Sequence, residues 1–254
     1  MQKPGDPELL HLVEELSPER DLQDLYIVPV LLSPKDYNSP SADLDTNSLE
    51  PEVLELFKNH NAAQDKISSI ILEGQSLWPG FSERFWPLHL EYNRADENGF
   101  IQSKDEYCKV YGKIILSYNK EGYGSMQVNA LHLLIFRKYD PKKFYSVKDG
   151  HLLRQKADGR EVSIPVKVIK SEQETLYFEV STGHLVQAEI QFDKNVVKLS
   201  MDKFVLIDKA RDVVLPTLIK IKVPDEFFTV PLGSKAKFEK IIQLTIDPNE
   251  VRIE

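Results

Sequence analysis

Six histidines are the side chains with the clearest chemical potential, since imidazole serves as a metal ligand and as a general base near neutral pH. They are spread along the whole chain: His11, His60, His89, His132, His151 and His184. None has a second metal-type ligand two to four residues away on a helix, so their spacing predicts no metal site. His60 ends an apolar helical stripe and His184 follows a turn glycine, and both are expected to be structural.

A nucleophile or a cofactor site would leave a local motif, and the common ones are missing from the sequence. There is no GxGxxG after a strand, no GK[ST] loop, no GxSxG and no HExxH. Cys108 is the only cysteine, which excludes an intrachain disulfide, and its setting in YCKV predicts a strand or core position. The sequence therefore predicts a protein that is not an enzyme and that has no cofactor and no metal.

One dense aromatic cluster occurs, in the segment LWPGFSERFWPLHLEY at residues 77–92. A carbohydrate platform of a polysaccharide-acting enzyme would use such residues, and so would a lid over an apolar cavity. A plain core with a β-bulge explains them equally simply and is the interpretation we favour. The residues concerned are Trp78, Phe81, Phe85, Trp86 and Tyr92.

Composition limits the classes of partner. The chain has 254 residues, 41% of them hydrophobic and 28% charged, and a net charge of −8 with the two signs interspersed. A nucleic-acid surface needs concentrated positive charge, so no nucleic-acid partner is expected. We expect a monomer.

The cellular compartment depends on whether residue 1 is the true start. No window approaches the ~20 apolar residues of a membrane-spanning helix, and MQKPGDPELL lacks the profile of a secretion signal. A cytoplasmic protein is expected if residue 1 is the true start. The polar start also resembles the tether that follows the lipidated cysteine of a bacterial lipoprotein, with Met1 in place of that cysteine. In that case a leader was removed, and the protein is periplasmic or associated with the outer membrane through a lost N-terminal lipid anchor.

The first 48 residues are predicted to lie apart from the main domain. Asp6-Pro7-Glu8 begins a helix over residues 7–16, and YIVPVLL (26–32) is strand-like, with Pro29 confining it to a sheet edge or an extended arm. Residues 33–48 read as a linker rich in Ser, Pro and Asn. We therefore divide the chain into 1–48 and a β domain at 49–254.

A helix and many short strands are predicted for the second part. Val53, Leu56, Phe57 and His60 share one helical face over residues 51–60. Runs rich in Ile, Val, Tyr and Phe follow, at 66–74, 85–92, 107–118, 131–136 and 142–147. Turns are predicted at 119–122, 148–150, 157–159 and 181–183. The segment 131–153 is thus interpreted as a hairpin with a basic turn at 137–143.

Strict alternation marks the strands of the C-terminal half. Val186, Ala188, Ile190 and Phe192 alternate with polar residues, and residues 196–208, 217–223 and 238–246 make further strands. Such alternation indicates one buried face and one solvent-exposed face, which is typical of an antiparallel sheet. We expect a mainly β protein with a few helices (α+β), in which a large, strongly curved antiparallel sheet forms a half-barrel under a helix lid. Its interior is either fully packed or a cavity for an apolar ligand.

One set of turn and strand residues matches a known pattern: Thr182-Gly183, Ala188-Glu189, Phe204, Asp208 and Leu215-Pro216-Thr217 with Ile219 and Ile221, and, in the earlier hairpin, Arg137, Pro141, Phe144 and Asp149-Gly150. Through these residues the sequence resembles the LolA/LolB-like proteins, the periplasmic lipoprotein carriers and related lipoprotein-sorting folds. The resemblance covers about residues 50–247. Two features depart from it: Lys138-Tyr139-Asp140 separates Arg137 from Pro141, and the linker at 33–48 and the helix before it are extra.

The resemblance implies an apolar concave face that holds acyl chains of a lipid or lipoprotein, in lipid or lipoprotein handling in the cell envelope. The alternative is a structural or protein-interaction β domain with a fully packed sheet and no ligand. The expected ligand-binding residues are Phe57 on the lid helix and, on the sheet, Phe136, Phe144, Ala188, Ile190, Phe192, Ile219 and Ile221.

Overall fold

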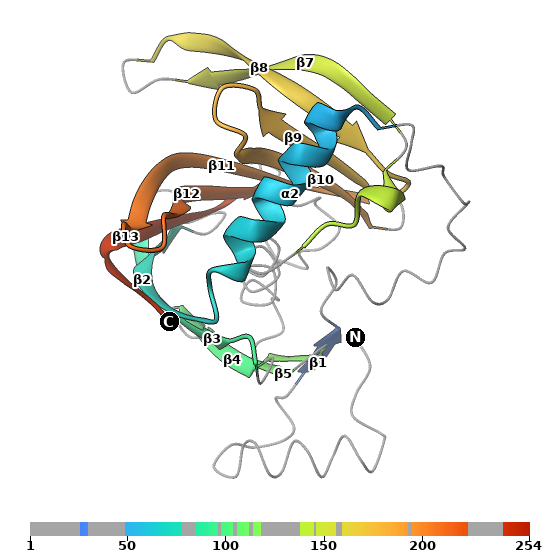
Figure 1. Cartoon of the computed structure of the whole chain (residues 1–254). Coiled ribbons are helices and arrows are strands. Elements are labelled where there is room, and N and C mark those ends of the chain that lie inside the picture. Colours follow the sequence, from blue (N-terminus) through green and yellow to red (C-terminus); the bar gives the residue numbers. More distant parts are fainter. Residues whose placement is uncertain are drawn as a thin grey trace, which may run out of the picture.

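A single antiparallel sheet dominates the molecule (Figure 1). The computed structural model describes residues 26–29, 49–77, 85–95, 98–103, 106–111, 114–117, 138–144, 146–155, 159–192, 195–222 and 241–254. Within these residues the sheet has thirteen strands. They are β1 (Tyr26–Pro29), β2 (Ser69–Leu77), β3 (Phe85–Asn93), β4 (Asn98–Ser103), β5 (Glu106–Tyr111), β6 (Ile114–Ser117), β7 (Ser146–Gln155), β8 (Glu161–Lys170), β9 (Glu174–Glu179), β10 (Leu185–Phe192), β11 (Asn195–Asp208), β12 (Val213–Lys222) and β13 (Ile241–Ile253).

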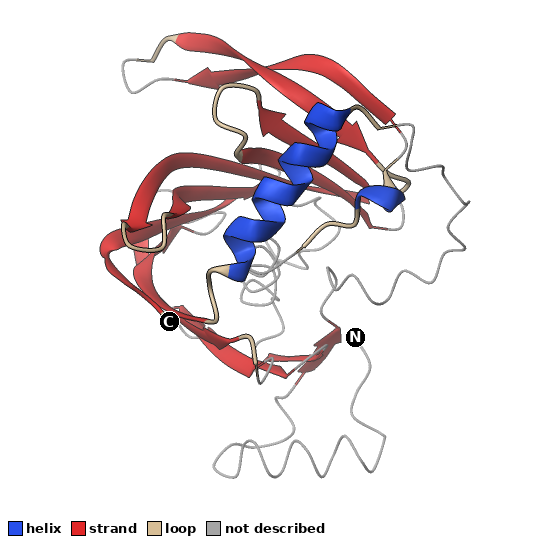
Figure 2. Cartoon of the chain, in the orientation of Figure 1, coloured by secondary structure: helices blue, strands red, loops and turns tan. Residues whose placement is uncertain are grey.

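The sheet is built from two runs of sequential strands joined along one ladder. Its order is β1-β6-β5-β4-β3-β2-β13-β12-β11-β10-β9-β8-β7, and every neighbouring pair is antiparallel. Among the described strands, the β2–β13 ladder alone connects the two runs. The sheet curves strongly around the helix (Figure 2), so the expected open half-barrel with a helix over one face is confirmed.

Helix α2 (Pro51–Asp65) crosses the concave side of the sheet (Figure 1). Proline stands in its first turn, where its missing N–H costs no hydrogen bond, and Glu52 places negative charge at the positive end of the helix. Val53, Phe57 and Gln64 are buried along one stripe. The helix predicted at 51–60 is therefore confirmed and continues to Asp65, because Gln64 extends the buried stripe by one more turn.

The main core lies between α2 and the concave face. Val53 and Phe57 of the helix pack there with the alternate residues of the strands, among them Ile219 and Ile221 of β12, whose neighbours Lys220 and Lys222 point to the other face. The burial of alternate residues follows the period of two that the sequence shows.

A second, smaller core lies on the opposite face at the β7–β8 end. Val166 and Val168 alternate with Ile169, which belongs to the main core, so their side chains lie on the outer face of β8. They pack with Val186 of β10, and Phe204 of β11 packs against both this cluster and the main core. The β7–β8 hairpin therefore curls over the outer face of the neighbouring strands.

One turn prediction is wrong. Lys148-Asp149-Gly150 lies inside β7, where Asp149 pairs with Lys167 and Gly150 with Val166 in the β8 ladder. The Asp149 carboxylate is 2.9 Å from the Lys167 ammonium, so this acid is held on the sheet surface rather than in a turn.

The strand predicted at 142–147 is also wrong in its first half. Residues Pro141–Lys143 form a 3₁₀ helix, η3, because proline occupies its first position and Asp140 Oδ1 accepts a hydrogen bond from the Lys142 N–H at 3.0 Å. Residues 131–137 lie outside the described residues. The return strand of the expected hairpin is thus replaced by η3 followed by β7.

The strands predicted at 26–32 and 107–118 are both present in the sheet. The segment 26–32 with Pro29 contributes β1 at the edge of the sheet, as expected. The run 107–118 divides into β5 and β6, and the β4 strand was not anticipated. The helix at 7–16, the linker at 33–48 and the turn at 119–122 lie outside the described residues. The division into 1–48 and 49–254 stays a prediction.

Candidate functional site

A pocket of about 410 Å³ lies between the C-terminal half of α2 and the sheet. The helix side is formed by Asn59, His60, Ala62, Ala63 and Gln64, with Lys66 just beyond the helix end. The opposite side is formed by the turn before β10 and by β11, β12 and their connection. Those residues are Thr182, Gly183, His184, Leu185, Met201, Phe204, Asp212, Val214, Leu215 and Pro216. We call this the α2 pocket.

The floor of the α2 pocket is the edge of the main core. Leu185, Met201 and Leu215 line the pocket and are also members of the core cluster under α2. Phe204 adds an aromatic ring whose centroid is 4.5 Å from the His184 ring, with only 4° between the planes. A ligand in the pocket would touch apolar surface that is continuous with the concave face.

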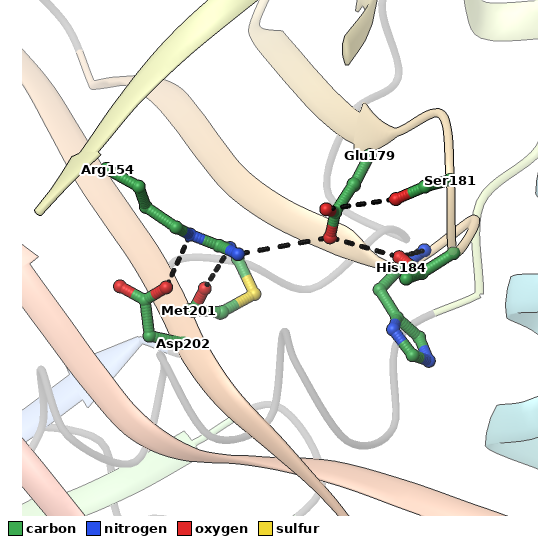
Figure 3. Close-up of polar contacts among 7 residues, drawn as sticks. Arg154, Glu179, Ser181, His184, Met201 and Asp202 are labelled. Atoms are coloured by element: carbon green, nitrogen blue, oxygen red, sulfur yellow. Dashed lines mark hydrogen bonds and ion pairs between the residues drawn. The ribbon is translucent and has the colours of Figure 1, made fainter. Parts of the chain in front are cut away.

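The turn that carries Thr182 and His184 is built by local hydrogen bonds (Figure 3). Gly183 has a φ of +69°, a left-handed conformation that glycine adopts without a Cβ clash. The Ser181 and Thr182 hydroxyls each donate to the Glu179 carboxylate at 3.1 Å, and the His184 N–H donates to Thr182 Oγ1 at 3.2 Å. The turn predicted at 181–183 is therefore confirmed, and it holds one wall of the pocket.

Arg154 of β7 connects this turn to β11 (Figure 3). Its guanidinium is 2.5 Å from Asp202 Oδ1, donates to the Met201 carbonyl at 3.0 Å, and lies 3.9 Å from Glu179 Oε2. Burial raises the pKa of the Asp202 carboxyl, an effect that Arg154 opposes. Because Arg154 reaches from β7 to β11, it fixes the curled β7–β8 hairpin.

The rim of the pocket carries a paired charge. Lys66 Nζ donates to the Asp212 carbonyl at 3.0 Å and lies 3.8 Å from the Asp212 carboxylate. Burial lowers the pKa of His184, so this imidazole is neutral at pH 7. The described lining is thus close to electroneutral, with imidazole, amide and hydroxyl groups set among apolar side chains.

Aromatic packing fastens α2 to the sheet near the pocket. The Phe57 ring centroid is 4.9 Å from that of Phe144, 5.9 Å from that of Phe178 and 6.3 Å from that of Tyr139. His60, which lines the pocket, has its ring centroid 5.2 Å from that of Tyr139. Such tilted and edge-on pairs add to the burial of each ring.

The residues that the sequence assigned to ligand binding gather in the main core. Phe57, Phe144, Ala188, Ile190, Ile219 and Ile221 are all buried in the one cluster under α2. Phe136 and the side chain of Phe192 lie outside the described residues. None of the six is among the residues that line the α2 pocket. Their role in binding stays a prediction.

The pocket residues were missed by sequence reasoning. The sequence predicts Thr182-Gly183 and Phe204 only as turn and strand positions, and it predicts that His184 is structural. The available signal was the left-handed glycine next to a histidine, but the α2 partners of this turn lie more than a hundred residues earlier in the chain.

The aromatic cluster at 77–92 does not form a platform within the described residues. Trp86 packs against the main core and Tyr92 is buried in it, whereas Phe85 is 48% exposed and alternates with Trp86 along β3. This agrees with the core interpretation. Trp78 and Phe81 lie outside the described residues.

Two kinds of feature are absent from the described part of the chain. No group of three or more His, Cys, Asp or Glu side chains there is arranged to hold a metal ion. No helix there is long and apolar enough to cross a membrane.

Comparison with known proteins gives matches of structure only. A scan of family models and a search of the curated proteins find no match. A putative outer membrane lipoprotein-sorting protein domain from Vibrio parahaemolyticus matches with 9% identity and a TM-score of 0.43, covering 79% of this chain and 92% of that one. A LolA superfamily protein from Nitrosomonas europaea matches with 9% identity and a TM-score of 0.44, covering 79% and 93%. The lipoprotein LppX from Mycobacterium tuberculosis matches with 8% identity and a TM-score of 0.25, covering 78% and 95%.

The Nitrosomonas protein belongs to the LolA superfamily, which is also the family that this sequence resembles.

Proposed function

We propose that this protein binds the acyl chains of a lipid or lipoprotein, without catalysing a reaction, in the α2 pocket and on the adjoining apolar face under α2. The observation that carries the proposal is the continuity between the pocket and the core. Leu185, Met201 and Leu215 belong to both, so an acyl chain that enters the pocket meets apolar surface that leads under the helix.

The physical demands of this function are modest. Each methylene removed from water contributes about 0.8 kcal/mol, so about ten buried methylenes supply roughly 8 kcal/mol before the costs of ordering the chain. No catalytic group is needed. A cavity of about 410 Å³ is within the size range of small-molecule sites, and displacement of α2 would enlarge it.

A pocket-filling variant tests the proposal. Ala62 lines the pocket on an exposed turn of α2, so Ala62→Trp should fill it while leaving the core unchanged. Lys58→Trp places the same side chain on α2 at a position that is exposed and does not line the pocket. We expect the affinity for a fluorescent long-chain acyl probe with an uncharged head group to fall about tenfold or more in Ala62→Trp and to stay unchanged in Lys58→Trp. Equal binding by the two variants, or no binding by the natural chain, would refute the proposal.

One observation favours the alternative, a structural or interaction domain without a ligand. Phe57 is fully buried and its ring contacts three aromatic neighbours, so α2 is packed tightly on the sheet. Native mass spectrometry separates the two functions. Co-purified lipid supports the carrier, and a bare monomer or a defined protein complex supports the alternative.

We place the protein in the cell envelope as part of the same proposal, as a monomer that is periplasmic or bound to the outer membrane through an N-terminal lipid. Support comes from the sequence resemblance. Fractionation of the native cells with intact mass measurement tests it. An unlipidated chain in the cytoplasmic fraction would overturn this location and leave the binding proposal to its own test.

A further inference from the structure

We infer that the α2 pocket selects an uncharged, hydrogen-bonding head group, so that the preferred lipid is an acylglycerol or a similar neutral lipid rather than a fatty acid or a phospholipid. This inference rests on the proposed acyl-chain binding and names the class of lipid. It follows from the charges and polar groups of the described lining.

The charges of the pocket lining disfavour an anionic head group. Among the described residues that line the pocket, Lys66 and Asp212 are the side chains with a full charge at neutral pH, and they are paired with each other. A carboxylate or phosphate entering the pocket would find its nearest cation already engaged by an acid. Moving an unpaired charge out of water is costly, whereas a hydroxyl or an ester loses less.

The polar groups of the pocket lining suit a hydroxyl or ester head group. Asn59 and Gln64 have side-chain amides, each able to donate and to accept a hydrogen bond. Burial lowers the pKa of His184, which leaves a neutral imidazole ring with one donor and one acceptor. Hydroxyl and ester groups have the same mixed character. A pocket can therefore recognise hydroxyl and ester groups without carrying a net charge.

The polar groups and the apolar floor of the pocket come from different elements. The polar groups come from α2 and from the turn at Thr182, whereas Leu185, Met201 and Leu215 form the floor that joins the main core. A neutral head group near the helix amides would direct its acyl chain toward this floor. One face of the head group would lie against the Phe204 and His184 rings.

Three chain-matched probes test the selection: monooleoylglycerol, oleate and oleoyl lysophosphatidate, each below its micellar concentration. We expect the natural chain to bind monooleoylglycerol about tenfold or more tightly than either anion in a displacement assay, with binding lost in Ala62→Trp and kept in Lys58→Trp. Equal affinities, or tighter binding of an anion, would overturn the head-group inference and keep the acyl-binding function. Absence of binding by all three would overturn the function itself.

A charge variant makes the test independent of differences in solubility among the probes. Asp212 has a φ of +53°, and asparagine adopts this left-handed conformation readily, so Asp212→Asn removes the partner of Lys66 without backbone strain. We expect the affinity for oleate to rise about two- to fivefold relative to that for monooleoylglycerol. Asp208→Asn, which changes an acid outside the pocket lining, is the matched control and should alter neither affinity. An unchanged oleate affinity in Asp212→Asn would contradict the role assigned to the paired charge.

Discussion

Asn61 and Tyr139 are joined by two hydrogen bonds that bring segments 78 residues apart into contact. The Asn61 side-chain N–H donates to the Tyr139 carbonyl at 2.8 Å, and the Tyr139 backbone N–H donates to Asn61 Oδ1 at 2.8 Å. Tyr139 is only 3% exposed. One amide side chain on α2 therefore satisfies both backbone groups of a buried residue in the segment before η3, and helps to keep the helix on the sheet.

Asn61→Ala should remove both hydrogen bonds and leave the Tyr139 backbone groups without these partners. Because buried polar groups are costly to leave unpaired, we expect the free energy of unfolding to fall by about 1–3 kcal/mol. Urea unfolding measures this. Asn59→Ala, on an exposed position of the same helix, should change it by no more than about 0.5 kcal/mol. Equal losses in the two variants would contradict the anchoring role of Asn61.

The N-terminal end of α2 has a different attachment. Lys167 of β8 is 14% exposed, and its Nζ lies 2.9 Å from Asp149, 3.6 Å from Glu52 and 3.9 Å from Glu50. The hydrogen bond to Asp149, together with the other two acids, raises the pKa of Lys167. The ammonium thus remains charged and ties the first turn of the helix to the sheet.

Lys167→Met should release that turn while keeping most of the length of the side chain. We expect amide hydrogens at residues 53–57 to exchange faster, because the three carboxylates lose their shared cation and repel one another. Lys170→Met, at an exposed position on the same strand, is the control. Exchange that is as slow in Lys167→Met as in the control would show that aromatic packing alone holds the helix end.

Much of the fold could be predicted because its signals are local. The alternation of Ile219 and Ile221 with lysines gives the strand and its dry face, and the Val53–Phe57 stripe gives the helix. The turn predicted at Asp149-Gly150 is wrong because these two residue types favour turns only when considered in isolation. In the structure the ladder to β8 and the ion pair with Lys167 hold both residues in an extended strand.

The α2 pocket could not be predicted because it depends on distant partners. Ala62 and Gln64 meet Thr182 and Leu215 only after the sheet has closed around the helix, and no local pattern records that meeting. The alternation of apolar and polar residues along the strands also does not distinguish core residues from pocket residues. Ile190 and Met201 share the dry face, but only Met201 reaches the pocket.

The pKa values of two histidines are shifted in opposite directions from the ordinary value of 6.5. Burial tends to lower the pKa of His89, but hydrogen bonds to Glu73 and to Glu91 (Nε2 to Oε1, 3.1 Å) outweigh it and raise the pKa above 6.5. Burial lowers the pKa of His184 below 6.5, with Glu179 opposing. An NMR titration of the ring resonances should place the midpoint of His89 above that of His184, and the reverse order would contradict both environments.

The same shifts predict opposite effects of pH on stability. The folded state binds the His89 proton more tightly than the unfolded chain, so this contribution is present below about pH 6.5 and is lost as pH rises through the folded pKa. His184 resists protonation when folded, so its contribution is present above about pH 6.5 and is lost as pH falls toward the folded pKa. His89→Gln and His184→Gln should each remove one of these slopes from urea unfolding measured across this range.

The β2–β13 ladder should be the most sensitive point of the sheet, because among the described strands it alone joins β1–β6 to β7–β13. At Gly74 an added Cβ would lie 2.2 Å from the Thr245 carbonyl oxygen and 3.1 Å from the Ile246 Cα, both backbone atoms of β13. Backbone in a paired strand cannot move aside by rotating a bond. Gly74→Ala must therefore push β2 away from β13, and we expect a loss of about 2 kcal/mol or more in the free energy of unfolding.

Gly150→Ala provides the comparison, because its added Cβ would meet a side-chain methyl, Val168 Cγ2, at 2.8 Å, with no backbone atom closer than 4.0 Å. That contact can relax by local repacking, so the loss should be smaller than in Gly74→Ala. Hydrogen exchange should also locate the damage, with protection lost first along residues 74–77 and 243–246 in Gly74→Ala. If the two variants lose the same stability, or if exchange rises evenly over the sheet, the β2–β13 ladder does not have this special role and the two halves are held together mainly by α2 and the core beneath it.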